Sequence, residues 1–577
     1  MRTTTLLAGL TSALLLSACT GETTDDETTD HSLEALDPAL SLTSGGQDLL
    51  SASDFADAAP RVHVEAAADP ATGLVEGAVH ARIVAGPADE LAFRFFPGLA
   101  ETAADATVGQ VVVDGADAES ELDAGLLTVA LPAEHASGVT VEIPFSYTLA
   151  ESEEPSPLDI LGDGDALSPA TIGLLARWPD RLTLGHWFPL WLPPGVRDDA
   201  DPRGFGDIGN FAAADLSLSL TVPAGWSVID GGIRADEEST DDRTTITSYA
   251  TGMRDLAVAV VRDFASESRT VDGVTVTAWS PQDDAEVLDA VLDETTSAIT
   301  TLSEAFGAYP WKEFDVVSTP LAGAVGGMEW PGTTWIEQSA FAGGIPGLGD
   351  LGGLLGPLGG DEGGLGTLLS TTRPWTIAHE VAHSWWTVLV GNDSIASPVV
   401  DEPLAQYSAC LVMRERRDDA TEVCAAQILS GFSSLEATGD EDAPADQASD
   451  EFASPTQYGG VIYGKAAWFY LALEEELGEE SLRDALREVV EAHAFETVDG
   501  AGLRADLVSA LGEQVGPLWD RWMEQVHGAE DMPEFDAGTG GLGGLGGLEN
   551  LDDLDLENLD PGLLAELMDL LGQLQSS

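Results

Sequence analysis

Residues 376–403 read TIAHEVAHSWWTVLVGNDSIASPVVDEP and are the most informative part of the chain. His379 and His383 lie four positions apart, and Glu380 directly follows the first of them. Residues at i and i+4 face the same way on an α-helix, so both imidazoles can reach one ion while Glu380 points toward its open side. Chance would give about 0.01 such motifs in a chain of this composition. The spacing therefore predicts a helix that carries a catalytic zinc site.

A third zinc ligand follows in the same stretch. Glu402 stands after 18 intervening residues, between Asp401 and Pro403. Since Pro is tolerated in the first turn of a helix, we expect a second helix to begin here with Asp401 as its cap. By the same argument Thr372 and Pro374 place the start of the first helix. A glutamate at the start of the second helix can approach the ion from a neighbouring element.

The charge balance excludes two classes of partner. Acidic residues number 101 and basic residues 23 among 577, which gives a net charge of −78. Only Lys312 and Lys465 are lysines. Neutralising nucleic-acid phosphates or docking on anionic lipid requires clustered Lys and Arg, so the chain is not expected to bind nucleic acid or to use a basic membrane patch. Hydrophobic residues make up 44%, enough for large cores.

The N-terminus is typical of an exported protein. Residues 1–19 (MRTTTLLAGLTSALLLSAC) have a basic start and an apolar run too short to span a bilayer, as in a cleaved signal peptide. Residues 16–19 (LSAC) resemble the lipobox of bacterial lipoproteins. The resemblance implies that Cys19 is lipidated and anchors the chain to the outer face of the bacterial cell membrane, or to its periplasmic side, without a membrane span. An ordinary secretory signal with an incidental Cys is the alternative.

Two more cysteines, Cys410 and Cys424, stand in helical-looking sequence on either side of a polar turn. An oxidising compartment would permit a disulfide between them. Free buried thiols are equally compatible with the sequence, because the bridging geometry cannot be tested there.

The spacing of hydrophobic residues along the chain divides it into regions of different predicted secondary structure. Residues 20–58 are rich in Thr, Asp and Glu and predict a solvated acidic tether. Alternation with period two, as in Leu216, Leu218, Leu220 and Val222, predicts a β domain over 59–267. From 268 to 530 the pattern is mostly helical, with an apolar stripe along 288–306 and a short strand around 314–317. We therefore expect an α+β protein of two folded domains.

Two low-complexity segments complete the chain. Residues 343–370 form a Gly/Leu-rich insert inside the second domain, and 531–577 form an acidic Gly/Leu-rich tail. Flexible connections are the plain interpretation of both. A cover for a cleft, or a partner-binding tail, is the alternative interpretation.

At this point the sequence resembles a family, the aminopeptidase N family of gluzincin zinc metallopeptidases. His383 and Glu402 have the family spacing, and residues 326–329 (GGME) resemble its G-x-M-E-N exopeptidase motif. Residues 463–466 (YGKA), 61 positions after Glu402, resemble its tyrosine followed by a basic and a small residue. The run at 306–310 (FGAYP) resembles the segment before a sheet strand. The resemblance implies an N-terminal β-saddle domain on a thermolysin-like catalytic domain.

The family roles carry over residue by residue as expectations. His379, His383 and Glu402 would bind one Zn²⁺ per chain. Glu380 would be the general base toward a zinc-activated water. Tyr463 would donate a hydrogen bond to the oxyanion of the tetrahedral intermediate, where a placed donor matters most.

The exopeptidase motif implies how a substrate is held. Glu329 would anchor the free α-ammonium of a peptide, which limits cleavage to the first residue. The backbone around Gly326, Gly327 and Met328 would hold the peptide as an added strand. The expected partners are thus extracytoplasmic peptides with a free N-terminus, cleaved at their N-terminal bond.

Several positions depart from the family pattern. Trp330 stands where Asn is usual, Pro403 stands where Gly is common, and the insert lengthens the path from Glu329 to His379 to 50 positions. The resemblance ends near Trp522, so no superhelical C-terminal domain is expected. A zinc endopeptidase or another hydrolase on the same fold is therefore an alternative. A non-catalytic surface lipoprotein that binds partners is a second one, which needs neither base nor oxyanion donor.

Overall fold

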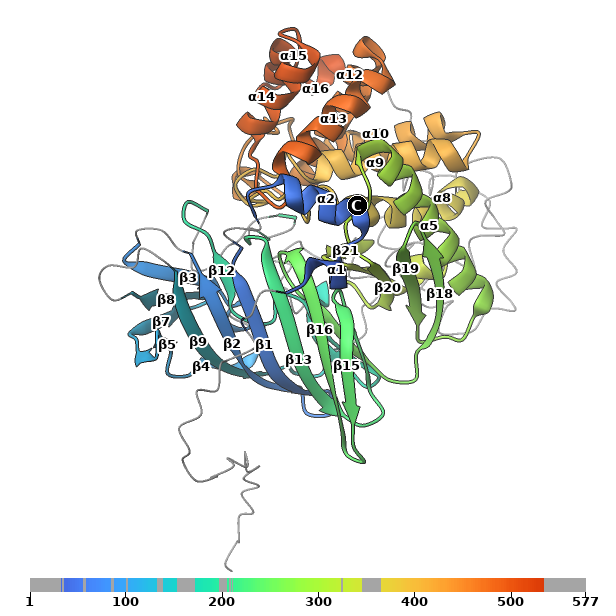
Figure 1. Cartoon of the computed structure of the whole chain (residues 1–577). Helices are drawn as coiled ribbons and strands as arrows, with labels where there is room; N and C mark the ends of the chain where they lie inside the picture. The colour runs from blue at the N-terminus through green and yellow to red at the C-terminus, as the bar shows by residue number, and fades with distance from the viewer. Residues whose placement is uncertain are drawn as a thin grey trace, which may run out of the picture.

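A computed structural model describes residues 33, 36–55, 59–84, 88–99, 102–131, 138–152, 172–196, 205–206, 209, 211–322, 325–344 and 365–533. A sheet-rich half is followed by a half in which helices dominate, so the predicted α+β class is confirmed (Figure 1). Over those residues no helix is both long and apolar enough to cross a membrane. Cys19, the core of the insert (345–364) and the tail from 534 onward lie outside the described residues.

The described residues of the first half form three sheets. The largest has the order β15-β16-β13-β1-β2-β9-β5-β6, with β4 also paired to β9, and two four-stranded sheets have the orders β10-β11-β17-β14 and β12-β3-β8-β7. The strands are β1 Arg61–Asp69, β2 Leu74–Ile83, β3 Glu90–Arg94, β4 Ala104–Val108, β5 Val112–Val113, β6 Ala116–Asp117, β7 Ser120–Asp123, β8 Leu126–Ala130, β9 Val139–Thr148, β10 Leu175–Trp178, β11 Arg181–Leu184, β12 Leu190–Leu192, β13 Ala214–Pro223, β14 Ser227–Asp230, β15 Ile233–Ser239, β16 Arg243–Met253 and β17 Val258–Val261.

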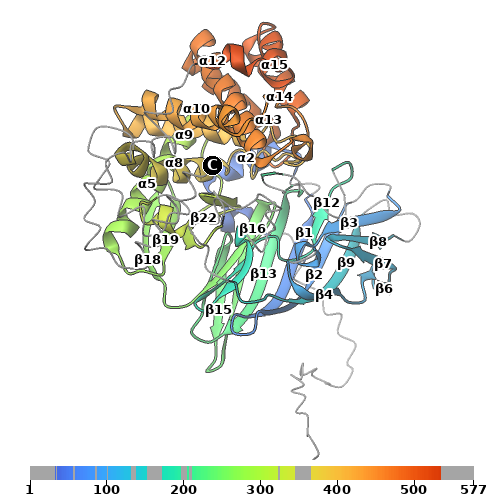
Figure 2. The same cartoon turned by 180° about the vertical axis from the view of Figure 1, so that it is seen from behind.

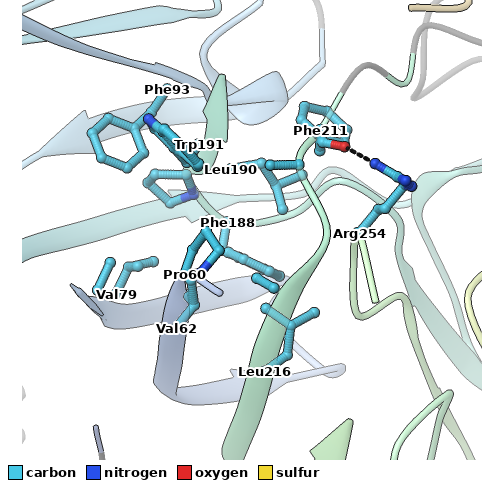
Figure 3. A pocket seen from close by; sticks show the side chains of 14 residues that line it. Pro60, Val62, Val79, Phe93, Phe188, Leu190, Trp191, Phe211, Leu216 and Arg254 are labelled. Atoms are coloured by element: carbon cyan, nitrogen blue, oxygen red, sulfur yellow. Dashed lines mark hydrogen bonds between the residues drawn. The ribbon is translucent and has the colours of Figure 1, made fainter. Parts of the chain in front are cut away.

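Period-two alternation in the sequence corresponds to strands with one face in the core. In β13 the side chains of Leu216, Leu218, Leu220 and Val222 are all buried, as the alternation predicts. A cavity of about 20 Å³ is left between the large sheet and the β12–β3 pair (Figure 3). That volume holds little more than one water molecule, so this layer is a packed core.

The second half contains a five-stranded sheet, order β18-β19-β20-β22-β21, under a set of helices. Its strands are β18 Ala265–Val271, β19 Val274–Ser280, β20 Glu313–Thr319, β21 Gly327–Trp330 and β22 Thr333–Glu337. The described helices of the chain are α1 Pro38–Ser41, α2 Ser44–Ala52, α5 Ala285–Phe306, α6 Gln338–Phe341, α8 Leu365–Ala382, α9 Glu402–Arg416, α10 Ala420–Thr438, α11 Pro455–Gly459, the π-helix η6 Gly460–Ala466, α12 Ala467–Leu477, α13 Glu479–His493, α14 Gly500–Leu511, α15 Val515–Met523 and α16 Gly528–Asp531, with short 3₁₀ turns η2 Phe96–Gly98 and η5 Ser449–Glu451.

Two predicted elements of the second half are confirmed, and two boundaries shift. The stripe of α5 is fully buried, and β20 contains the strand expected at 314–317. However, β18 begins at Ala265, so the expected border at 267/268 falls inside a strand of the second sheet. The prediction that Thr372 and Pro374 open the zinc helix is also wrong. The helix α8 begins at Leu365 and keeps Pro374 inside it, and so absorbs the end of the Gly/Leu-rich insert.

The predicted tether at 20–58 is wrong for the residues that the structure describes. Residues 36–55 form α1 and α2 at the junction of the two halves (Figures 1 and 2), and we call them the strap. Ser41 Oγ donates to Thr251 Oγ1 of β16 at 2.9 Å. On the other side, the amide of Thr43 donates to the carbonyl of Pro310 at 2.8 Å. The acidic composition of this region predicts a solvated tether, but its few apolar residues are enough to dock the strap on the folded domains.

Cys410 of α9 and Cys424 of α10 are both free and both buried. The sequence leaves open whether these cysteines form a disulfide or remain free thiols, and in the structure they are free thiols. Burial and the neighbouring Cys424 thiol together raise the pKa of Cys410 well above its usual value. Buried neutral thiols of this kind are poor nucleophiles, so they act as small apolar residues between the helices.

The strap predicts a stability effect at one apolar residue. Leu42 is fully buried against Trp311, whereas its neighbour Leu40 is 46% exposed. We expect Leu42→Ala to lower the free energy of unfolding by about 2–4 kcal/mol, because a buried leucine leaves a cavity when truncated. Leu40→Ala is the matched control and should change it by less than about 0.5 kcal/mol. Urea unfolding measures both, and equal effects would show that the strap is not part of the folded core.

Candidate metal centre

Two helices bring three ligand atoms together. His379 lies on the last turn of α8, His383 directly follows the last residue of that helix, Ala382, and Glu402 is the first residue of α9. The two histidine Nε2 atoms are 3.2 Å apart, and Glu402 Oε2 lies 3.1 Å from that of His379 and 3.5 Å from that of His383. Tetrahedral zinc with bonds of 2.0–2.2 Å places neighbouring ligand atoms about 3.3–3.6 Å apart. The predicted ligands therefore form a triangle of the size that zinc requires.

Hydrogen bonds behind His383 fix its tautomer. Its Nδ1 lies 3.0 Å from the carbonyl oxygen of Trp386 and 3.1 Å from Thr387 Oγ1. Because the carbonyl can only accept, Nδ1 carries a proton, so Nε2 is the nitrogen that would bind an ion after losing its own proton. Thr387 holds this position with a φ of 115°, a conformation that a β-branched residue rarely adopts. Strain of this kind persists where the surroundings over-determine it, here beside the metal ligands.

The start of α9 is built as the sequence predicts. Asp401 caps the helix, because its side chain accepts a 2.8 Å bond from the amide of Glu402. The other carboxylate oxygen of Asp401 accepts from Asn392 Nδ2 at 2.8 Å and from Ser394 Oγ at 2.7 Å. Burial raises the pKa of Asp401 to about 6. This network holds the helix terminus rigidly, so Glu402 is presented to the histidines without freedom to turn away.

The electrostatics of the centre separates ligand from base. Burial alone would raise the pKa of Glu402, but the charge of His383 and hydrogen bonds from both histidines hold it well below the usual range. Burial raises the pKa of Glu380 to about 8. Glu380 Oε2 is buried and has no hydrogen-bond partner among the described residues. An ionised ligand and an adjacent, more basic carboxylate with an open oxygen suit a metal site with a water to deprotonate.

The strand β21 faces this base. It is the edge strand of its sheet and pairs antiparallel with β22 on one side only. A Cβ atom on Gly327 would lie 2.5 Å from Glu380 Oε1, so only glycine lets the strand come this close. Glu329, two residues on, faces the same way and belongs to a set with Glu380 and His383 whose ligand atoms lie within 4.8 Å of one another. The structure thus brings the predicted amine anchor to the base.

Trp330 lies on the opposite face of β21 from Glu329. It is buried against Trp335, with ring centroids 5.0 Å apart, and its ring fills the space beside Gly185 of the first domain. The departure from the family motif at this position therefore changes the packing between the two halves.

Tyr463 approaches from the third side of the centre. It lies in the π-helix η6, and its ring stacks beside that of His379 with centroids 6.0 Å apart. Burial, followed by the charge of Glu402, raises the pKa of its hydroxyl well above the usual value, so it remains a donor at neutral pH. Tyr458 packs against it with centroids 6.1 Å apart. All the expected site residues in the described chain therefore surround one point.

Sequence reasoning missed three supports of the centre. The backbone of Thr387, the π-helical register of 460–466 and the Asn392–Asp401 contact do not follow from periodicity. A pair of glycines flanking Tyr463, at 460 and 464, is the signal available for the second of these, because such residues permit close helix approach.

A sheet-rich domain joined to a helical domain, with two histidines at the end of one helix and a glutamate at the start of the next, matches the arrangement expected of a gluzincin zinc metallopeptidase. Residues 370–522 match the model of the peptidase family M1 domain. The match covers the part of the chain that carries the whole ligand set, and it confirms the resemblance to the aminopeptidase N family.

Solved structures share the fold over both halves of the molecule. The M1 zinc metallopeptidase of Deinococcus radiodurans has a TM-score of 0.57 at 16% identity, over 83% of this chain and 95% of that one. Native yeast LTA4 hydrolase has a TM-score of 0.56 at 16% identity, over 84% of this chain and 70% of that one. The first match extends along nearly the whole of the bacterial enzyme, so the two-domain architecture is common to both.

The geometry predicts that substitutions of two neighbouring glutamates have different effects on zinc binding. We expect the purified chain to hold one zinc, and Glu402→Ala to weaken zinc binding at least about 100-fold, because a buried ligand is lost. Glu380→Ala should keep the zinc and lose most turnover, since the base is not a ligand. Metal analysis after dialysis against a weak chelator measures occupancy. A wild-type chain that holds no zinc would overturn the site and favour a non-catalytic binding protein.

Proposed function

We propose that this M1 metallopeptidase is an aminopeptidase that removes the N-terminal residue of peptides. The observation that carries the proposal is Glu329, whose carboxylate faces the site within one cluster with Glu380 and His383. A bound peptide with a free α-ammonium gains charge-assisted hydrogen bonds from this carboxylate. Since the carboxylate is fixed on a strand beside the metal centre, the bond presented to the base is the first peptide bond.

The chain's own residues divide the reaction between them. His379, His383 and Glu402 would hold a zinc ion, which when bound would supply Lewis acidity at the scissile carbonyl. Glu380 takes a proton from the attacking water and returns it to the leaving amine, a task for which its raised pKa suits it. Tyr463 donates a hydrogen bond from its hydroxyl to the oxyanion that forms, from a half-buried position that strengthens the bond.

The edge of the sheet supplies the substrate's register. The outer side of β21 (residues Gly327–Trp330) is unpaired with any strand in the described part of the chain. A peptide added there forms main-chain hydrogen bonds with the segment that contains Gly326, Gly327 and Met328. Extended pairing fixes the peptide backbone without reading its side chains, so this edge serves peptides of varied sequence.

Two neighbouring structures support a peptide substrate. An M1 zinc metallopeptidase from Deinococcus radiodurans, with a TM-score of 0.55 at 15% identity to this chain, was solved bound to a Tyr-Ser-Ala substrate. A two-domain M1 zinc metallopeptidase, with a TM-score of 0.56 at 16% identity, was solved bound to L-arginine. A tripeptide and a single amino acid correspond to the substrate and the product of an aminopeptidase.

Paired substrates test the proposal. An aminoacyl fluorogenic substrate with a free amine should be cleaved at least about 100-fold faster than its N-acetyl form, because acetylation removes the charge that Glu329 binds. Glu329→Ala should lower kcat/KM for the free-amine substrate and leave the low kcat/KM for the N-acetyl substrate unchanged. Zinc chelation should abolish both rates.

A matched control for Glu329 is Glu329→Gln, which keeps the shape of the side chain and removes its charge. It should resemble Glu329→Ala in selectivity while holding zinc normally. Equal cleavage of free and acetylated substrates by the wild-type enzyme would defeat the aminopeptidase assignment and favour an endopeptidase or another hydrolase on this fold.

The second part of the proposal concerns location. The sequence at 16–19 supports export and lipidation at Cys19, which would hold the enzyme on the outer face of the bacterial membrane where extracytoplasmic peptides pass. Labelled palmitate fed to a bacterial host should enter the wild-type chain and not Cys19→Ser. Export without label in the wild type would instead indicate an ordinary secretory signal.

A further inference from the structure

Lys465 is the most deeply buried cation near the proposed oxyanion donor. Its side chain is 1% exposed, and its ammonium donates to Asp442 Oδ1 at 2.7 Å, to the carbonyl oxygen of Gln525 at 3.2 Å and to that of Ala443. Three acceptors saturate the three hydrogens of the ammonium group. Burying a lysine costs free energy unless it is paired in this way, so the site is built for this charge.

The lysine belongs to the same turn as Tyr463. The π-helix η6 has the sequence GVIYGKA, in which Lys465 is the single charged residue. Tyr463 packs against His379 on the metal side, whereas the partners of Lys465 belong to the loop at 439–451 and to the chain beyond α15. Lys465 therefore fastens the π-helix from the side opposite to the metal centre.

The remaining surface of η6 is tightly enclosed by α10. A Cβ atom on Gly464 would lie 2.8 Å from the amide nitrogen of Phe432, and one on Gly460 would lie 2.8 Å from the side chain of Leu435. The packing alone holds the turn laterally. It does not set its register, since glycines offer no side chain that locks into α10. Lys465 adds directional, charge-assisted bonds to this packing, so it can fix the register that the glycine contacts leave open.

The carboxylate that binds Lys465 is itself fixed. The second oxygen of Asp442 accepts a 2.8 Å bond from the amide of Gly528. The loop that carries it is held by Ser454 Oγ donating to Asp440 at 2.8 Å and by Gln457 Nε2 donating to the carbonyl of Glu441 at 2.7 Å. The loop at 439–451 is therefore a rigid mount, although its acidic composition suggests a solvated connection.

We propose that Lys465 is a positioning residue, which with Asp442 fixes the register of the π-helix and so holds the Tyr463 hydroxyl where the oxyanion forms. A π-helix is less favourable than an α-helix and persists where specific contacts favour it. Without the buried pair, the turn can relax toward α-helical register, which rotates Tyr463 about the helix axis. The inference rests on the proposed role of Tyr463 in the reaction.

The test removes both charges at once, so that no carboxylate is left buried without a partner. In the double variant Lys465→Met with Asp442→Asn, we expect kcat to fall about 10-fold or more, with KM and zinc content unchanged, because an oxyanion donor acts in the transition state. Lys465→Arg keeps a cation and should retain more activity than Lys465→Met.

A double-mutant cycle separates positioning from general stability. In the Tyr463→Phe background the hydroxyl is already absent, so the charge-free pair should lower kcat no further. Lys312→Met is the matched control, because Lys312 also binds main-chain carbonyls, those of Ala39 and Leu40 in the strap. It should lower the melting temperature and leave unchanged the factor by which Tyr463→Phe reduces kcat.

Each result has one meaning. If the charge-free pair lowers kcat equally in both backgrounds, or raises KM in step with a loss of zinc, Lys465 is merely structural and the inference is overturned. If Tyr463→Phe by itself has no effect on kcat, the proposed role of Tyr463 fails first, which is a separate outcome. If kcat survives the loss of both charges, the register of η6 does not depend on the pair and the inference is equally overturned.

Discussion

A buried carboxylate held between two imidazoles is the interaction on which the rest of this molecule depends. Glu402 can sit beside His379 and His383 only if α8 ends where α9 begins its approach. That condition fixes the crossing of the two helices, and the Asp401 network then fixes the start of α9. Burial of an unpaired charge is costly, and the two histidines offset that cost for Glu402.

The same condition explains why the sheet-rich domain is needed. The strand β21 must lie against Glu380, and its turn is held from outside: a Cβ atom on Gly231 of the first domain would lie 1.7 Å from the carbonyl oxygen of Pro331. Trp330 fills the junction below the same strand. The first domain therefore presses the edge strand onto the zinc helix, and its contact is part of the geometry that presents Glu329.

Much of the fold and most of the site could be predicted from the sequence, for a physical reason. The stripe of α5, the alternation of β13 and the HEVAH motif are all local periodicities, and local periodicity is what burial on one face imposes. The predictions for the strap and for the start of α8 were wrong because these features depend on contacts between distant segments. Leu42 is buried where its backbone bridges to Trp311, which lies far along the chain, and no neighbouring residue indicates it.

The chain has a net charge of −78 and only two lysines, and the contacts of those two lysines show what they are used for. Lys312 and Lys465 both bind main-chain carbonyls, one to dock the strap and one to fasten the π-helix. Lysine suits this task because its compact ammonium donates in three directions, whereas the planar fork of arginine matches carboxylates. Ion pairs of the described surface accordingly use arginine, as in Arg269 with Asp289. Both lysines thus bind main-chain carbonyls, while the excess of acidic residues keeps a strongly charged protein in solution.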